Sequence, residues 1–358
     1  MMELQALQDR RKLLSEYKYE KKELNRGYTD KTLYINISTN EIKEKDVPQE
    51  MKEKFIGGKG YGMRYLWDAV TPNTRWDSEE NEIIVAVGPV GGITQYPGSG
   101  KSLVCTISPM TDIPIDSNVG GYFGPYLKFS GFDALEIQGK AERDVVIIID
   151  GKKKTIRIEE APLEAVDGHV LGEQLTHMYG NSETEKRLVS VITAGTAAEH
   201  TRIGILNFTF YDVRRKTARM KQAGRGGIGT VFRNKKIKAV VVIAEEVRGN
   251  LNNAFDQSII NETGIKLHRE VAHNDHLQNN MRKIGTANII EVMDAYDLLP
   301  VHNFQYGCHP DTKKIESKVF IRDYCTQNMP DGCWYGCSVA CSKAADNFVL
   351  KTGPYKGH

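Results

Sequence analysis

The chain has 358 residues, of which 40% are hydrophobic and 26% charged, a composition typical of a globular protein with two or three domains. Forty-eight basic and 46 acidic residues leave a net charge of +2, which favours neither nucleic acid nor an acidic membrane as a partner. The longest apolar runs, residues 145–149 and 237–244, are far shorter than the roughly 20 residues of a membrane span. Because the first residues contain no apolar signal core, we expect a cytoplasmic protein.

The first elements along the chain are a charged segment and a hairpin. Residues 1–27 carry leucines at helical spacing among many charges, and we interpret them as an appended, solvated helix or tail. Alternating residues from Thr32 predict a strand, residues 38–40 a turn, and the following residues a returning strand. A helix is predicted from the glycines at 57–62 through Trp67. Further strands are expected at residues 83–87, 134–138, 145–149 and 155–159.

The pattern changes near residues 245–252. Short strands dominate before this point, whereas residues 253–297 show helical patterning with few strand signals. We therefore expect an α+β protein with three parts: an N-terminal extension (1–27), a strand-rich domain (28–246) and the start of a mainly helical domain (247–358).

The stretch GSGKS at residues 98–102 invites comparison with a phosphate-binding P-loop. A P-loop requires glycine four residues before its Gly-Lys pair, where this chain has Gln95. It also leads directly into a helix, but the residues after Lys101 are β-branched and end in proline, which predicts a strand. The ATPase interpretation is therefore disfavoured.

Four glycine-rich segments lie at residues 57–62, 88–92, 118–124 and 224–229. Successive backbone amides at glycines can bind anions, so their repetition suggests a large phosphorylated ligand, although an ordinary tight turn explains any single segment. The segment at 224–229 resembles a dinucleotide-binding motif, but the polar residues 212–222 predict no buried strand before it, which excludes that fold. Arg225 offers a forked donor for phosphate oxygens.

Three cysteines, Cys333, Cys337 and Cys341, form the sharpest motif in the chain. Three thiolates within nine residues suit an iron–sulfur cluster, with zinc binding or inert packing as alternatives. On a continuous helix the outer two would be separated by about 12 Å of rise, so the segment must curl at Gly332 and Gly336. We interpret the scattered Cys105, Cys308 and Cys325 as small buried hydrophobic residues.

Several of these motifs occur together, and in the same order, in one enzyme family. The segments concerned are residues 55–62, 118–142, 223–240, 299–305 and the cysteine cluster. With them, residues 30–358 resemble the N-terminal part of aldehyde ferredoxin oxidoreductases, the tungstopterin enzymes of anaerobes. The resemblance implies a strand-rich base domain of two β-sheets with helices. This base would carry two pterins that share one tungsten or molybdenum, with their phosphates bridged by magnesium.

The resemblance also implies site residues. Lys101 stands where the family has a basic residue, usually arginine, that reaches a pterin phosphate and the adjacent cluster. Two loops would hold the phosphates and magnesium, and three thiolates would bind a [4Fe-4S] cluster. The loop residues are Asn118, Val119, Gly120, Gly121, Gly224, Arg225, Gly226 and Gly227, and the thiolates are Cys333, Cys337 and Cys341. The cysteine spacing is three-then-three instead of the family's two-then-three, and lysine lacks the fork of arginine.

The implied reaction is oxidation of a small aldehyde to a carboxylic acid, with electrons passed through the cluster to ferredoxin or another iron–sulfur carrier. We expect the catalytic groups and the fourth cluster cysteine in a C-terminal half that this chain does not contain and that a separate gene could encode. A reductase subunit of the benzoyl-CoA type and a truncated or split, non-catalytic cofactor-binding subunit are the alternatives. Homo-oligomerisation stays open.

Overall fold

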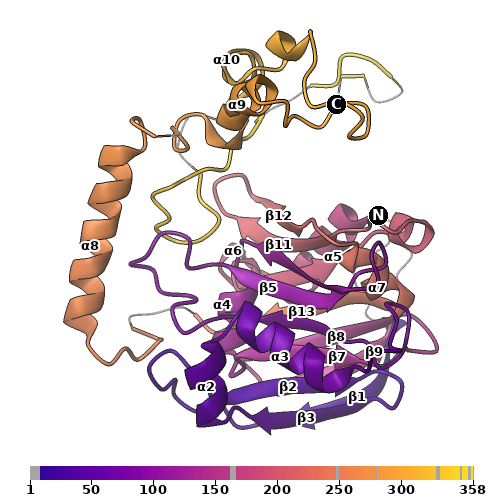
Figure 1. Cartoon of the computed structure of the whole chain (residues 1–358). Coiled ribbons are helices and arrows are strands. Elements are labelled where there is room, and N and C mark those ends of the chain that lie inside the picture. Colours follow the sequence, from indigo (N-terminus) through magenta and orange to yellow (C-terminus); the bar gives the residue numbers. More distant parts are fainter. Residues whose placement is uncertain are drawn as a thin grey trace. The chain divides into compact units, whose positions relative to one another are not determined.

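The computed structural model describes residues 9–161, 167–246, 250–278, 280–327, 331–346, 349–353 and 356–357. The chain divides into two compact units (Figure 1). The first unit contains Met1–Ile93 and Ser99–Gln257, and the second contains Thr94–Gly98 and Ser258–His358. The second unit thus includes a five-residue segment, Thr94–Gly98, from far earlier in the sequence, which we call the strap.

The first unit contains a six-stranded mixed sheet with the order β3-β2-β7-β4-β5-β6. Its strands are β2 (Lys31–Asn36), β3 (Glu41–Asp46), β4 (Ile83–Ala86), β5 (Ser102–Ile107), β6 (Pro114–Val119) and β7 (Ala134–Gln138). β2 and β3 form the predicted hairpin, and β2 pairs in parallel with β7. The strand predicted after Lys101 is β5, which confirms that this lysine does not belong to a P-loop.

A seven-stranded mixed sheet completes this unit, in the order β1-β9-β8-β13-β10-β11-β12. Its strands are β1 (Lys12–Lys18), β8 (Val145–Asp150), β9 (Thr155–Glu160), β10 (Val189–Thr193), β11 (Leu206–Asp212), β12 (Thr217–Ala223) and β13 (Ile237–Ile243). Only β8 and β13 pair in parallel. Since these central strands are buried on both faces, their sequences are nearly continuous runs of valine and isoleucine.

Helices cover both sheets and separate them. α2 (Gln49–Phe55) and α3 (Lys59–Ala69) pack through Met51 and Leu66 on the outer face of the six-stranded sheet (Figure 1). α5 (Gly168–Tyr179) covers the seven-stranded sheet through Leu171 and Leu175 and is followed by the short α6 (Glu183–Lys186). α4 (Phe123–Phe129) and α7 (Ile228–Asn234) contact strands of both sheets, with the 3₁₀ turn η1 (Thr196–His200) beside α7. The predicted α+β class with two sheets is confirmed.

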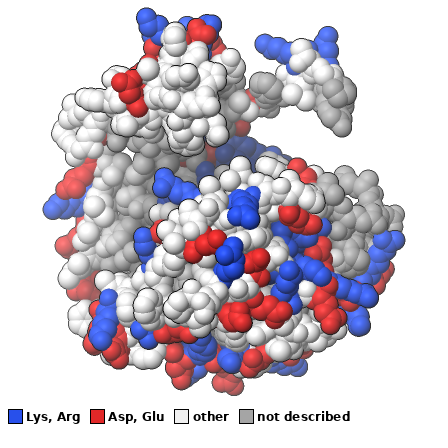
Figure 2. All heavy atoms as spheres, turned by 45° about the vertical axis from the view of Figure 1, so that its right-hand side comes forward, with Lys and Arg blue, Asp and Glu red and all other residues white. Residues whose placement is uncertain are grey.

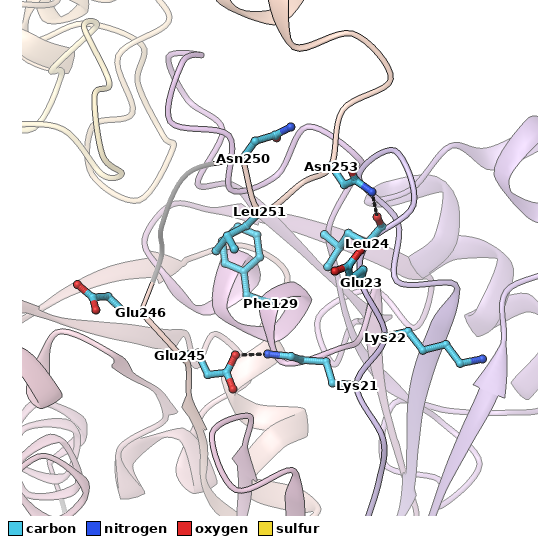
Figure 3. Close-up of a pocket in the computed structure, with 10 residues that line it drawn as sticks. All are labelled: Lys21, Lys22, Glu23, Leu24, Phe129, Glu245, Glu246, Asn250, Leu251 and Asn253. Atoms are coloured by element: carbon cyan, nitrogen blue, oxygen red, sulfur yellow. Dashed lines mark hydrogen bonds and ion pairs between the residues drawn. The ribbon is translucent and has the colours of Figure 1, made fainter.

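The expectation of a solvated extension over residues 1–27 is wrong for its described part. β1 pairs antiparallel with β9, and Tyr19 and Leu24 are buried. Figure 3 shows the next residues lining a cavity, where Lys21 forms an ion pair with Glu245 and the Asn253 side chain donates to the carbonyl of Leu24 at 3.0 Å. β1 lies at the edge of the seven-stranded sheet, where a strand needs apolar residues on one face only. Its many charged residues therefore did not show the alternation by which a strand is recognised in a sequence.

The prediction that no strand precedes Gly224 is also wrong. β12 ends at Ala223, but it is a half-buried edge strand that pairs only with β11, and antiparallel to it. Its polar sequence reflects that edge position. Because a dinucleotide-binding fold requires a parallel strand–helix–strand unit here, the antiparallel pairing itself excludes that fold.

The second unit is mainly helical. It contains α8 (Gln257–Asn274), η2 (Gly285–Ile289), α9 (Ile290–Ala295), η3 (Thr312–Lys314), α10 (Ser317–Val319) and the π-helical turn η4 (Phe320–Tyr324). Among the described residues of this unit, the hydrophobic side chains that are buried are those of Trp334 and Ala340. Ile265, Leu298 and Phe304 are exposed. This unit therefore buries little apolar surface by itself.

Two properties of the surface bear on partners. Lys and Arg are interspersed with Asp and Glu on the face drawn in Figure 2, in keeping with the near-neutral composition. No helix in the described part of the chain is long and apolar enough to cross a lipid bilayer.

A buried pair of carboxyl groups makes stability depend on pH. Glu82 is 2% and Glu136 is 1% exposed, and burial raises the pKa of Glu82 to about 8. The unfolded chain releases this proton near pH 4.5, so the folded chain binds more protons between about pH 5 and 8 and loses stability as the pH rises. We expect Glu82→Gln to remove most of this loss, about 3 kcal/mol between pH 5 and pH 8. Thermal unfolding at pH 5 and pH 8 measures it.

The exposed Glu50 gives the matched control. Glu50→Gln removes a carboxylate that pairs with Lys54 at the surface of α2, so its unfolding should retain the pH dependence of the unsubstituted chain. A Glu82→Gln variant whose melting temperature falls between pH 5 and 8 as steeply as that of the control contradicts the assignment.

Candidate cofactor-binding residues and cysteine loop

The β5–β6 hairpin brings the predicted residues Lys101 and Asn118 to one end of the six-stranded sheet. Ser102 pairs with Val119 and Leu103 pairs with Asn118. Lys101 directly precedes β5, and Gly120 directly follows β6. Both therefore lie at the same end of the hairpin.

The second predicted loop lies along the same strand. The backbone amide of Arg225 donates to the hydroxyl oxygen of Ser117 in β6 at 3.1 Å. A Cβ atom on Gly226 would lie 2.4 Å from the side chain of Ile115, and one on Gly121 would come within 3.9 Å of Lys221 in β12. The edge strands of the two sheets thus run side by side here, and they bring residues 118–121 and 224–227 together.

The glycines of these loops divide into two kinds. A Cβ atom on Gly224 would meet nothing within 4 Å, and one on Gly121 would meet only Lys221. Gly227, with φ of +69°, would instead place a Cβ 2.1 Å from the carbonyl oxygen of Arg202. Gly226 and Gly227 therefore allow close packing, whereas Gly121 and Gly224 border open space that a ligand can fill.

Three polar side chains at these loops are exposed to solvent. Lys101, Asn118 and Arg225 are exposed, and within the described residues their side chains have no hydrogen-bond or ion-pair partner. Two cations and an amide with free donors beside open glycine backbone suit a phosphate group. The residues present therefore fit the phosphates of a pterin cofactor.

The three clustered cysteines lie on an irregular loop of the second unit. Residues 331–342 form turns and bridges instead of a helix, and Gly336 has φ of +67°. The backbone amide of Ser342 donates to the carbonyl of Asp331 at 3.1 Å and closes the loop at its base. The predicted curl of this segment is confirmed. Cys333, Cys337 and Cys341 are all half-buried.

The strap supports this loop. A Cβ atom on Gly336 would lie 2.7 Å from the carbonyl oxygen of Thr94. The thiol of Cys333 and the backbone amides of Ala340, Gly98 and Val339 hydrogen-bond the Cys337 sulfur, and these bonds hold the pKa of Cys337 well below its usual range. A thiolate with several amide donors is the ligand that metals and iron–sulfur clusters take.

The thiols are not gathered into a closed metal site. Among the described residues, no group of three or more His, Cys, Asp or Glu side chains is arranged to hold a metal ion. The donor chemistry of the loop fits an iron–sulfur cluster, and binding one would require the loop to draw its thiols together.

The other cysteines differ from one another. Cys105 is buried under α3, where burial raises the pKa of its thiol to about 12, so its interpretation as a small hydrophobic residue is confirmed. Cys325 is only half-buried. For Cys308 this interpretation is wrong, since its side chain is exposed.

Comparison with known proteins assigns the family. The model of the aldehyde ferredoxin oxidoreductase N-terminal domain matches residues 32–244, which is more than half of the chain, and that of domains 2 and 3 matches residues 262–356. The chain belongs to the aldehyde ferredoxin oxidoreductase family. Its predicted membership is confirmed.

Individual relatives agree with this family. A tungsten-containing aldehyde ferredoxin oxidoreductase of Pyrococcus horikoshii is 30% identical over 331 residues, which are 92% of this chain and 51% of the relative. An aliphatic sulfonate oxidoreductase, WOR-like subunit, of Pyrococcus furiosus is 27% identical over 92% of this chain and 51% of its own length. The chain thus spans about half the length of these curated relatives.

A solved structure shares the family's fold. The active-site complex BamBC of benzoyl-coenzyme A reductase, with bound 1,5-dienoyl-CoA, superposes with a TM-score of 0.63 at 22% identity, over 90% of this chain and 48% of that one. At this identity the likeness supports the fold alone.

Sequence reasoning missed one residue that shapes this family member's glycine loops. Lys128 in α4 is fully buried, and its ammonium donates to the carbonyl oxygens of Gly88 at 2.6 Å, Gly91 at 2.9 Å and Pro89 at 3.0 Å. It also donates to the Asn252 side chain at 3.2 Å. No sequence signal distinguishes this lysine, because its partners are backbone atoms distant in sequence.

The cavity in Figure 3 contains none of the predicted site residues. It measures about 380 Å³, and Phe129 and Leu251 contribute apolar side chains to its lining. Its lining comes from residues 21–24 and from the segment after β13. We assign no cofactor to it.

Proposed function

We propose that this chain is the cofactor-binding part of a cytoplasmic tungsten–pterin oxidoreductase that oxidises a small aldehyde to a carboxylic acid. Electrons would leave through a [4Fe-4S] cluster to ferredoxin or a similar iron–sulfur carrier. The observation that carries the proposal is the pair of adjoining glycine loops with the unengaged side chains of Lys101, Asn118 and Arg225. The name of the Pyrococcus horikoshii relative supports the choice of reaction.

Within the first unit, the chain's own residues would bind and orient the cofactor. Lys101 and Arg225 would neutralise pterin phosphates, and the amides of Gly120, Gly121 and Gly224 would approach them closely because no side chain intervenes. Asn118, Val119, Gly226 and Gly227 complete the two loops, with the amide oxygen of Asn118 available to magnesium. A bound tungsten or molybdenum bis-pterin supplies the two-electron oxidation itself.

Within the second unit, Cys333, Cys337 and Cys341 would supply thiolates to the cluster. The amide donors around Cys337 would stabilise the negative charge on its sulfur and so tune the reduction potential of the cluster. The strap is part of this environment through the amide of Gly98.

The second unit offers an apolar surface to further protein under this proposal. The second unit exposes large apolar side chains such as Ile265 and Leu298, and the chain spans about half the length of its curated relatives. A segment equivalent to the relatives' other half would cover that surface and supply the catalytic groups. Without such a segment, the chain would serve as a non-catalytic cofactor-binding subunit.

Metal analysis tests the proposed cofactor. The chain is purified anaerobically from cells supplied with tungstate and molybdate, with and without any polypeptide encoded downstream, and its tungsten and molybdenum are measured by mass spectrometry. We expect about one of these metal atoms per chain, and at least several-fold less in Lys101→Gln/Arg225→Gln, because two phosphate-binding charges are lost.

The turn between β8 and β9 provides a matched control. Lys152→Gln/Lys153→Gln removes two exposed charges there and should retain the metal. The proposal is contradicted if the unsubstituted chain contains neither tungsten nor molybdenum in both preparations. Equal metal in the two double variants would contradict the role of Lys101 and Arg225.

A further inference from the structure

A second polar cavity lies within the first unit, at the end of α7 away from Gly227. It measures about 410 Å³ and is lined by α7, η1, the start of β13 and residues 140–144. Four cations line it, Lys140, Arg233, Lys236 and Lys238, against the two carboxylates of Asp144 and Glu199. The cavity therefore carries an excess of positive charge.

Both carboxylates are already engaged by Arg233. Its guanidinium donates to the two oxygens of Asp144 at 2.9 and 3.1 Å, and to Glu199 at 2.6 and 3.0 Å. Its remaining nitrogen donates to the carbonyl of Ile237 at 2.8 Å. This network satisfies Arg233, which is 5% exposed, and fixes the cavity wall.

The three lysines, by contrast, have donors to spare. Lys238 is only 5% exposed, yet its closest carboxylate oxygen is that of Asp144 at 3.6 Å, and no other partner of its ammonium occurs within the described residues. Lys140 donates to the side-chain oxygen of Asn234 at 3.1 Å, and Lys236 donates to the carbonyl of Glu142. Each ammonium carries three N–H donors, so most of these donors are free for a ligand.

The ammonium of Lys238 is buried, and it shares the carboxylate of Asp144, 3.6 Å away, with Arg233. An anion in the cavity would therefore offset part of the cost of burying this cation. Three ammonium groups that line one cavity suit a phosphate, which accepts several charge-assisted hydrogen bonds at once. Trp76 also lines the cavity and is half-buried, so it offers an apolar surface to the organic part of a ligand. Arg233 offsets one of the two carboxylate charges, and the four cations against two carboxylates leave the lining with a net charge of +2.

We propose that this cavity is a binding site for a phosphoryl anion, distinct from the proposed pterin loops. Lys140, Lys236 and Lys238 contact the phosphate, and Arg233 with Asp144 and Glu199 forms the rigid wall behind it. The inference does not depend on the proposed redox function, because none of these residues belongs to the cofactor loops or the cysteine loop.

Calorimetric titration of the full chain tests this site, with inorganic phosphate and adenosine monophosphate as probes. We expect saturable binding and at least tenfold weaker affinity in Lys236→Gln/Lys238→Gln. Since loss of the buried Lys238 could impair folding, Lys140→Gln/Lys236→Gln provides a second test at the two cavity lysines with hydrogen-bonded side chains. Lys152→Gln/Lys153→Gln, with the same loss of charge, should bind normally.

The double variant Lys101→Gln/Arg225→Gln separates the two proposed anion sites. Binding at the cavity should persist in this variant even if the pterin loops lose their ligand. Tighter binding of adenosine monophosphate than phosphate, abolished by Trp76→Leu, would identify an organic phosphate, and equal affinities would identify free phosphate. Absence of saturable binding of either probe, or binding that is lost only in Lys101→Gln/Arg225→Gln, overturns the proposal.

Discussion

Replacing Cys337 with serine should remove most of the iron from the anaerobically purified chain. The Cys337 sulfur accepts hydrogen bonds from the Cys333 thiol and from the amides of Ala340, Gly98 and Val339, so it is the thiol best prepared to act as a ligand. A serine hydroxyl ionises far less readily and binds iron poorly. We expect about four iron atoms per anaerobically purified chain and fewer than about one in Cys337→Ser.

Cys105→Ala is the matched control for this experiment. It removes a thiol that is buried among hydrophobic residues in the first unit and is chemically inert there. Its iron content and visible absorption should equal those of the unsubstituted chain. If Cys337→Ser retains its iron and an unchanged electron paramagnetic resonance spectrum after reduction, the cysteine loop does not hold the cluster.

Replacing Lys128 with methionine should destabilise the first unit by roughly 2–4 kcal/mol. Methionine keeps much of the apolar stem but cannot donate to the carbonyls of Gly88, Pro89 and Gly91 or to Asn252. The carbonyl of Gly88 would keep the backbone amide of Gly91 as a donor, but the carbonyls of Pro89 and Gly91 and the side-chain oxygen of Asn252 would lose this ammonium. Loss of a donor at a buried acceptor costs more than loss of an ordinary surface hydrogen bond. Calorimetry should show a fall of about 5–10 °C in the melting temperature.

Lys54, which is exposed on α2, provides a control variant that loses the same charge as Lys128→Met. Lys54→Met removes a surface lysine whose partner among the described residues is Glu50, and the melting temperature of this variant should change by less than about 2 °C. A Lys128→Met variant that melts within the same narrow range would show that the residue 88–92 loop does not depend on this ammonium group.

The strands of the first unit were predictable where their sequences carry a strong local pattern. A run of valine and isoleucine marked β8, and the alternation after Thr32 marked the β2–β3 hairpin. β1 and β12 were missed because each is an edge strand, so one partner strand and solvent together permit a charged or polar sequence.

The residues of the candidate site could be predicted from the sequence, but the contacts that support them could not. Glycine spacing identified residues 118–121 and 224–227, which the structure brings side by side along β6 and β12. The cage of carbonyls around Lys128 depends on contacts between atoms distant in sequence, which local patterns do not encode. The same holds for the amide that Gly98 donates to Cys337.

The strap has a consequence for proteolysis of the chain. Because Thr94–Gly98 belongs to the second unit while both its flanks belong to the first, the polypeptide passes from one unit to the other three times. A single protease cut between Gln257 and Ser258 would leave the strap attached to the N-terminal fragment and packed against Gly264 and Gly336 of the other. The two fragments should therefore co-elute under native conditions and separate only in denaturant, and a recombinant piece beginning at Ser258 would lack part of its own fold.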